Sequence, residues 1–168
     1  MTEITEIGIA RRLPPAHILL GIDWQSKKRV FEQISIVFEN TSGIAREQFF
    51  SVLFERERLG STFIGEGGAI PHGRLGNLKE PLCALVMLKH PIQYGVSDDG
   101  GGAVQVLFFL IAPQEANDIH LCILGVFAEM LSDQQLINNL WQCAEPEKVQ
   151  KIIANWEKEK GLSDGDKE

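Results

Sequence analysis

Two adjoining runs near the middle of the chain decide how it is interpreted: Arg56-Glu57-Arg58-Leu59-Gly60-Ser61-Thr62 and Gly65-Glu66-Gly67-Gly68-Ala69-Ile70-Pro71-His72-Gly73. An arginine offers a planar, permanently charged fork to phosphate oxygens, and hydroxyl groups offer further donors. A glycine-rich run lets backbone N–H groups approach an anion closely. Together the two runs predict a phosphoryl-transfer site around the imidazole of His72.

His72 lies between Pro71 and Gly73. Proline restrains the backbone and glycine removes a side chain, so we expect the ring at a well-defined, accessible loop position. Phosphorylation needs one ring nitrogen unprotonated near neutral pH and a hydrogen bond on the other nitrogen that aims the ring. We therefore predict that His72 is the phosphorylated nucleophile. The alternative is an ordinary surface-loop histidine, and the pattern does not say which nitrogen reacts.

Arg56 is predicted to neutralise the phosphoryl charge, because catalysis of phosphoryl transfer is mostly positioning and electrostatics. An arginine in the last turn of a helix is also favoured by the helix dipole alone, and Arg58 competes for the role. Ser61, Thr62 and the backbone at Gly67 are the predicted phosphate-binding groups. Hydroxyl residues after a helix-ending glycine are equally common as turn formers.

His120 falls in the first turn of a predicted helix, where backbone N–H groups and the dipole favour an anion. It is therefore a candidate for holding His72 or its phosphate, although a histidine there can also face solvent. A metal site formed by His72, His120 and Cys122 is disfavoured, because residues two apart on a helix point in different directions. We expect no metal and no cofactor, and we treat His17 and His90 as incidental.

The composition fits one domain with a sizeable core, since the chain has 168 residues of which 44% are hydrophobic. A net charge of −7 and a pI near 5.1 argue against nucleic-acid binding and against attachment to anionic lipid. The three cysteines lie in apolar contexts without CxxC spacing and are expected to be reduced core residues. No signal-like start and no apolar run of about 18 residues are present. We therefore expect a cytoplasmic protein without membrane insertion.

Helical spacing of apolar residues predicts helices over 26–40, 45–58, 117–131 and 146–161, with a short helix beginning at 132 or 133. The apolar runs 82–88 and 104–111 predict strands covered on both faces. Residues 18–20 are either an edge strand or part of a packed arm. These elements predict one α/β or α+β layered domain over 1–161, with a loosely packed arm over 1–25 and a disordered tail over 162–168.

The runs Gly60-Ser61-Thr62 and Ala69-Ile70-Pro71-His72-Gly73, with His120-Leu121, resemble those of a known family. They are similar to the type-2 IIA domains of the bacterial phosphoenolpyruvate-dependent phosphotransferase system, the fructose/mannitol IIA family. The resemblance extends from about 26 to 156, and the Gln25-Ser26-Lys27-Lys28 opening is most like the nitrogen-regulatory branch.

The resemblance implies a mixed β-sheet flanked by helices. It implies that His72 matches the phosphorylated histidine, His120 the paired second histidine and Arg56 the phosphate-binding arginine. The chain departs from the family around 98–103, where a triple glycine lengthens a loop and Ala103 stands where a proline often precedes the strand. That departure concerns partner contacts and leaves the chemistry intact.

The function expected from the resemblance is that of a histidine phosphocarrier, a protein-histidine phosphotransferase. His72 would accept phosphate from an HPr-like protein, and the phosphorylation state would regulate target proteins of nitrogen or potassium metabolism. Two alternatives stay open at this point. In one, a sugar-specific IIA passes phosphate to a IIB component; in the other, the domain is an interaction module in which phosphorylation is vestigial. The identity of the targets, the oligomeric state and the role of the Asp98–Gly102 loop are left undetermined.

Overall fold

The structure is a computed structural model, and it describes residues 8–95, 102–115 and 118–162. The helices are η2 (Ala10–Arg12), η3 (Pro15–His17), α1 (Lys27–Ser42), α2 (Arg46–Leu59), α3 (Asp118–Ser132), α4 (Gln134–Trp141) and α5 (Pro146–Glu159). The strands are β1 (Ile18–Ile22), β2 (Phe63–Gly65), β3 (Gly68–Ala69), β4 (His72–Leu75), β5 (Leu82–Gln93) and β6 (Ala103–Pro113). All five predicted helices and both predicted strands are present, and both strands are longer than expected.

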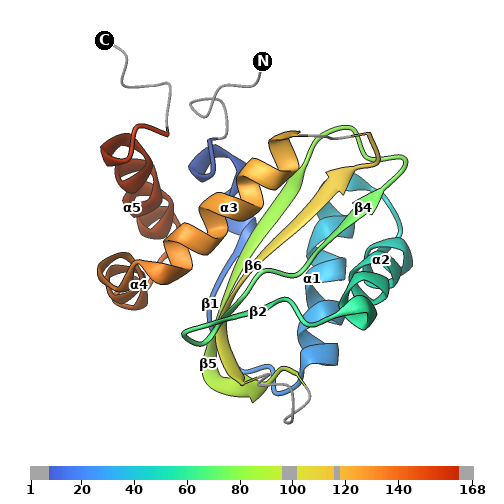
Figure 1. The fold of residues 1–168 in the computed structure, drawn as a ribbon, viewed down its shortest axis with the longest axis horizontal. Helices are drawn as coiled ribbons and strands as arrows, with labels where there is room; N and C mark the ends of the chain where they lie inside the picture. Colours follow the sequence, from blue (N-terminus) through green and yellow to red (C-terminus); the bar gives the residue numbers. More distant parts are fainter. Residues whose placement is uncertain (1–7, 96–101, 116–117, 163–168) are drawn as a thin grey trace.

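The sheet is mixed and has the order β1-β5-β6-β3-β2, with β4 also paired to β6. β5 and β6 run antiparallel in its centre, whereas β1 pairs parallel with β5, and β3 and β4 pair parallel with β6. The segment at 18–20 is therefore an edge strand. The predicted α/β architecture, a mixed sheet flanked by helices, is confirmed (Figure 1).

Helices cover both faces of this sheet: α3, α4 and α5 lie on one side, and α1 and α2 on the other (Figure 1). Alternate residues of a strand point to opposite faces. Phe108 and Leu110 of β6 accordingly pack with α3, and Phe109 and Ile111 pack with α1 and α2. The continuous apolar run of β6 thus follows from having a packed layer on each side.

The start of α1 is capped as predicted, since the Ser26 hydroxyl accepts the Arg29 N–H at 3.1 Å. Gly43 ends the helix at a φ of 80°, a left-handed conformation that glycine adopts without steric cost. Phe31, Ile34 and Phe38 are fully buried on the face that meets the sheet.

Part of the N-terminal arm, which was expected to be loosely packed, is held against the last helix. Ile9 and Leu13 are fully buried. The carboxylate of Glu157 accepts the N–H groups of Ile9 and Ala10, and the amide of Gln150 donates to Ala10 and Leu13 carbonyls. These bonds bring together segments more than 130 residues apart, which local sequence patterns cannot reveal.

The glycine-rich run forms two short strands, β2 and β3, which sequence periodicity did not predict. They pair antiparallel across a turn in which Glu66 and Gly67 have φ values of 57° and 74°. Strands of two to four residues are too short for an alternating pattern to register. The run therefore joins the sheet, and His72 begins a strand where a loop was expected.

Several expectations concern residues that the structure does not describe. The Asp98–Gly102 loop lies outside the described residues except for Gly102, and the predicted tail does so except for Leu162, which is buried. All three cysteines are free thiols; Cys83 is buried, and Cys122 and Cys143 are partly buried. Among the described helices, none is both long and apolar enough to cross a bilayer.

Candidate functional site

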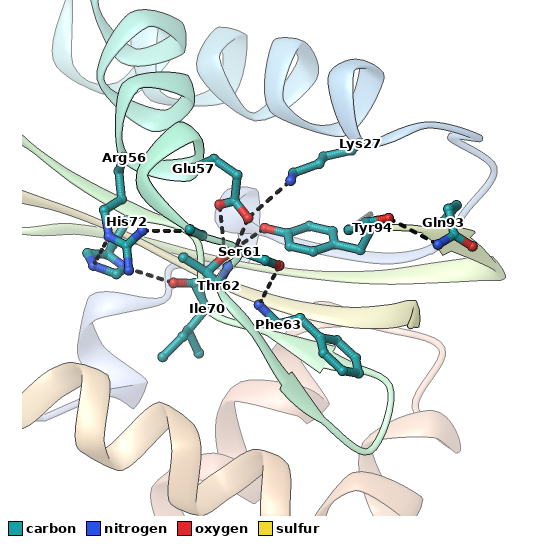
Figure 2. Close-up of polar contacts among 12 residues, drawn as sticks. Lys27, Arg56, Glu57, Ser61, Thr62, Phe63, Ile70, His72, Gln93 and Tyr94 are labelled. Carbon is teal, nitrogen blue, oxygen red and sulfur yellow. Dashed lines mark hydrogen bonds and ion pairs between the residues drawn. The ribbon is translucent and has the colours of Figure 1, made fainter. Parts of the chain in front are cut away.

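The backbone of β6 and the carbonyl of Ile70 together fix the orientation of His72. His72 pairs with Leu110, whose N–H donates to the Pro71 carbonyl at 3.1 Å. Its Nδ1 lies 2.9 Å from the Ile70 carbonyl oxygen, which can only accept (Figure 2). Nδ1 therefore carries the proton, and Nε2 of the neutral ring bears the lone pair and can accept a hydrogen bond.

Arg56 lies beside that lone pair. Its Nε–H donates to His72 Nε2 at 3.3 Å (Figure 2). Its Nη1 donates to the Gly60 carbonyl at 2.8 Å. Arg58, the competitor from the sequence, borders the same pocket, but it pairs with Glu55 at 3.9 Å and its side chain is 75% exposed. The structure thus brings Arg56, and not Arg58, to His72.

Gly73 brings strand β4 close to helix α2. A Cβ atom at this position would lie 3.0 Å from Cγ2 of Val52 and 3.2 Å from the Val52 carbonyl oxygen. Val52 and Arg56 are four residues apart on α2 and therefore on the same face of the helix. The absent side chain of Gly73 thus allows the helix that carries Arg56 to approach His72.

His120 and Arg74 form the opposite wall. His120 is buried to 7% exposure in the first turn of α3, and its Nε2 is 2.7 Å from Nη2 of Arg74. A guanidinium can only donate, so this contact holds His120 Nε2 unprotonated. Arg74 also donates to the Gln114 carbonyl at 3.0 Å.

Sequence reasoning missed Arg74. The signal that could have identified it is the two-residue period of a strand, which puts Arg74 on the same face of β4 as His72. That signal depends on knowing that 72–75 is a strand.

These side chains line one open pocket of about 560 Å³. The pocket contains Arg56, His72, Arg74 and His120 on a floor that includes Leu110. Arg56 contacts the unprotonated ring nitrogen of His72, and Arg58 and Arg74 also line the pocket, with Glu55 among them. This excess of guanidinium groups suits a dianionic ligand. The three residues expected from the sequence to lie together, His72, His120 and Arg56, all line it.

The predicted phosphate-binding residues Ser61, Thr62 and Gly67 do not line this pocket. The Ser61 hydroxyl accepts the Phe63 N–H, and the buried Thr62 hydroxyl bonds to Glu57 and Tyr94 (Figure 2). The Gly67 carbonyl accepts bonds from β6 beside Val106, four residues along that strand from the partner of His72. Phosphate contact by these residues therefore stays a prediction.

The electrostatics favour a neutral imidazole. Burial lowers the pKa of His72 below its ordinary value, and the charge of Arg56 lowers it further. The hydrogen bond to Ile70 and the charge of Glu57 act in the opposite direction. At neutral pH the Nε2 lone pair is consequently available to a nucleophilic reaction.

The other two histidines lie outside the pocket. His17 is buried and bonds to the Cys83 carbonyl at 2.8 Å and the Thr41 hydroxyl at 2.6 Å, which makes it a structural link between the arm and α1. His90 is exposed on β5. Within 8–95, 102–115 and 118–162, no group of three or more histidine, cysteine or acidic side chains is arranged to hold a metal ion.

Comparison with known proteins defines the class to which this fold and site correspond. Residues 12–156 match the family described as the phosphoenolpyruvate-dependent sugar phosphotransferase system, EIIA 2. The chain belongs to this family.

Within the family, the chain is similar to nitrogen regulatory proteins. One from Pseudomonas aeruginosa is 33% identical over 150 residues, which cover 89% of this chain and 96% of the relative. The structure of nitrogen regulatory protein IIA-Ntr from Neisseria meningitidis superposes with a TM-score of 0.79 at 34% identity, covering 86% of this chain and 98% of that one.

A more distant structure shares the fold alone. It is enzyme IIA for mannitol from Escherichia coli, solved in complex with phosphorylated enzyme IIB, at 16% identity and a TM-score of 0.69. The match covers 84% of this chain and 96% of that one.

Proposed function

We propose that this protein is a histidine phosphocarrier in which Nε2 of His72 accepts a phosphoryl group from the phosphohistidine of an HPr-like protein. The proposal rests on which nitrogen of the His72 ring carries the proton. The ring's Nδ1–H donates to the Ile70 carbonyl, and its unprotonated Nε2 accepts the Arg56 Nε–H at 3.3 Å. The sequence left open which nitrogen reacts, and the hydrogen bond at Nδ1 supports Nε2.

In the proposed reaction, Nε2 attacks phosphorus as the N–P bond of the donor breaks, so that the donor nitrogen recovers its electron pair. The His72 ring keeps its Nδ1 proton, and the Ile70 carbonyl stabilises the positive charge that develops on the ring. Arg56 turns from the lone pair to the phosphoryl oxygens, and Arg74 and His120 stand on the other side of the pocket. No metal is required, because the guanidinium groups supply the positive charge.

The experiment incubates the protein with labelled phosphoenolpyruvate, enzyme I and the HPr-like carrier. An acid-labile, base-stable phosphate is expected on the wild type and on a His90→Ala control, and none on His72→Ala. Nuclear magnetic resonance of the labelled protein distinguishes Nε2 from Nδ1 as the phosphorylated atom. Label that persists in His72→Ala would contradict the proposal.

The similarity to nitrogen regulatory proteins supports a regulatory output in the cytoplasm. Phosphorylation would add a charge of about −1.5 to −2 to the pocket and thereby change which proteins bind there. A pull-down with phosphorylated and unphosphorylated protein tests this output and would identify partners. Partner binding that is the same for wild type, His72→Ala and His72→Asp would favour a pure interaction module.

The structure of the mannitol IIA in complex with phosphorylated IIB supports testing one alternative output, the transfer of phosphate to a IIB component. Labelled protein is mixed with candidate IIB domains, and movement of the label to IIB would favour sugar transport over regulation.

A further inference from the structure

A buried polar cluster lies directly behind Arg56, and the mechanism above does not use it. The cluster consists of Lys27, Glu57, Thr62 and Tyr94, and Figure 2 shows Glu57 between Arg56 on one side and Lys27 and Tyr94 on the other. Its members come from the first residue of α1, the last turn of α2, the loop after α2 and the segment just past β5. The cluster therefore joins four parts of the chain at one point.

The carboxylate of Glu57 is the centre of this cluster. It accepts the Thr62 N–H at 2.9 Å and the Thr62 hydroxyl at 2.8 Å, and it pairs with Lys27 Nζ at 3.1 Å. Only 3% of the Glu57 side chain is exposed. A buried carboxylate near the negative end of a helix dipole is unfavourable unless such partners compensate it.

The hydroxyl bonds have one direction. A carboxylate only accepts, so Thr62 donates to Glu57, and the Thr62 oxygen then accepts from the Tyr94 hydroxyl at 2.8 Å. Burial, followed by the charge of Glu57, raises the pKa of Tyr94, which keeps the phenol protonated as the donor. Lys27 Nζ also lies 4.2 Å from the centre of the Tyr94 ring, so the cation closes the cluster.

The cluster constrains the same short loop that holds Arg56. Glu57 anchors Thr62, and the Gly60 carbonyl, two residues earlier, accepts Nη1 of Arg56 at 2.8 Å. Gly60 has no side chain to restrict it, and Arg56 itself is only partly buried. The Gly60 N–H donates to the Glu57 carbonyl at 3.2 Å and the Ile70 N–H to the Thr62 carbonyl at 3.1 Å, so the Glu57 side chain adds a third restraint on this loop.

We propose that Glu57, through its bonds to Thr62 and Lys27, is a positioning residue that holds the Gly60 carbonyl and so keeps the Arg56 guanidinium against His72. This inference rests on the proposed phosphocarrier function, since it assigns a role in that reaction. Lys27 also neutralises the Glu57 charge, which would otherwise oppose the arrival of a phosphoryl anion.

The test is a double-mutant cycle on the rate of phosphoryl acceptance, measured in single turnovers with the phosphorylated carrier. Glu57→Gln keeps the shape of the side chain but loses the ion pair. It is expected to slow the step at saturating donor about tenfold, because small displacements of a catalytic group cost up to about 10². In an Arg56→Ala background the same substitution is expected to change the rate less than twofold, since the positioned group is absent.

Two further variants are measured so that the test does not depend on Glu57→Gln alone. Tyr94→Phe removes only the hydroxyl that supports Thr62 and is expected to slow acceptance about threefold, again only when Arg56 is present. Glu47→Gln removes a carboxylate from the other end of the same helix and is the matched control, with no expected change. If Glu57→Gln does not fold, the double-mutant cycle is measured with Tyr94→Phe and Arg56→Ala instead.

The outcomes separate the two proposals. Equal slowing by Glu57→Gln or Tyr94→Phe with and without Arg56 would mean a general structural effect and would overturn the positioning role alone. Absence of label on wild-type His72 would overturn the phosphocarrier function. A readout without phosphate is the Arg56 Nε–H resonance, which is expected to shift in Glu57→Gln and not in Glu47→Gln. An unchanged resonance would count against the positioning role in either case.

Discussion

Replacement of Arg56 by alanine is the most direct test of the pocket. The substitution removes the group whose Nε lies 3.3 Å from the His72 lone pair. In the resting protein this contact is long, so its loss changes the ground state little. In the transition state the guanidinium would face phosphoryl oxygens that carry at least one negative charge. The effect is therefore expected on the rate of transfer.

The magnitude follows from the geometry of the pocket. Two unit charges about 4 Å apart attract by about 4 kcal/mol at an effective dielectric constant of about 20. The pocket is open and Arg56 is only partly buried, so solvent reduces this value to about 2–4 kcal/mol. At about 1.36 kcal/mol per factor of ten, acceptance is expected to slow by about 30-fold to 10³-fold.

The assay is rapid-quench measurement of label transfer from the phosphorylated carrier at saturating donor, with circular dichroism to confirm folding. Arg46→Ala is the control, because it removes the same charge from the first turn of the same helix, where Arg46 pairs with Glu39 at 2.8 Å. The control is expected to remain within twofold of the wild type. A folded Arg56→Ala variant that accepts phosphate within threefold of the wild-type rate would refute the reasoning.

Three further predictions concern the surroundings of Arg56. Arg74→Ala releases the ring of His120 and removes a cation from the pocket, so acceptance is expected to slow about tenfold in the same assay; an unchanged rate would exclude a role for Arg74. Gly73→Ala places a methyl group 3.0 Å from Val52 and is expected to slow transfer about tenfold by displacing α2. The double variant with Val52→Ala should recover part of the loss, and no recovery would argue against displacement. Because burial lowers the pKa of His72 in the folded state, the unfolded chain binds more protons below about pH 6.5. The stabilisation by the neutral ring is therefore fully present above that pH and is lost as pH falls below it. Urea unfolding at pH 7.5 and 5.5 should show a smaller acid-induced loss for His72→Gln than for the wild type, and an equal or larger loss would contradict this sign.

Much of the fold could be predicted because it depends on local patterns. The Ser26 cap, the apolar faces of the helices and the apolar runs of β5 and β6 are encoded within a few neighbouring residues. The tight packing of the arm could not be predicted, because it depends on Glu157 and Gln150 at the other end of the chain. Strand β4 was not predicted for a similar reason, since it pairs with β6, 38 residues further along the chain.

The candidate site divides in the same way. The sequence indicated His72, Arg56 and His120 through a resemblance carried by short motifs. It did not indicate that the Thr62 hydroxyl donates to Glu57, because the motif identifies a hydroxyl and not its partner. It also did not indicate Arg74, whose contact with His120 forms only when β4 and α3 lie side by side.

The amino-acid sequence by itself therefore determined the family and the layered architecture, and it predicted His72 as the nucleophile, since each of these depends on residues close together in the chain. Only the tertiary structure decided which nitrogen of His72 is unprotonated, that Arg56 contacts it and that Arg74 contacts His120. The physical reason is that a hydrogen bond depends on the direction and distance of its partner. The Ile70 carbonyl and the Arg56 and Arg74 side chains reach their places through the pairing of β4 with β6 and the packing of α2 and α3 around it.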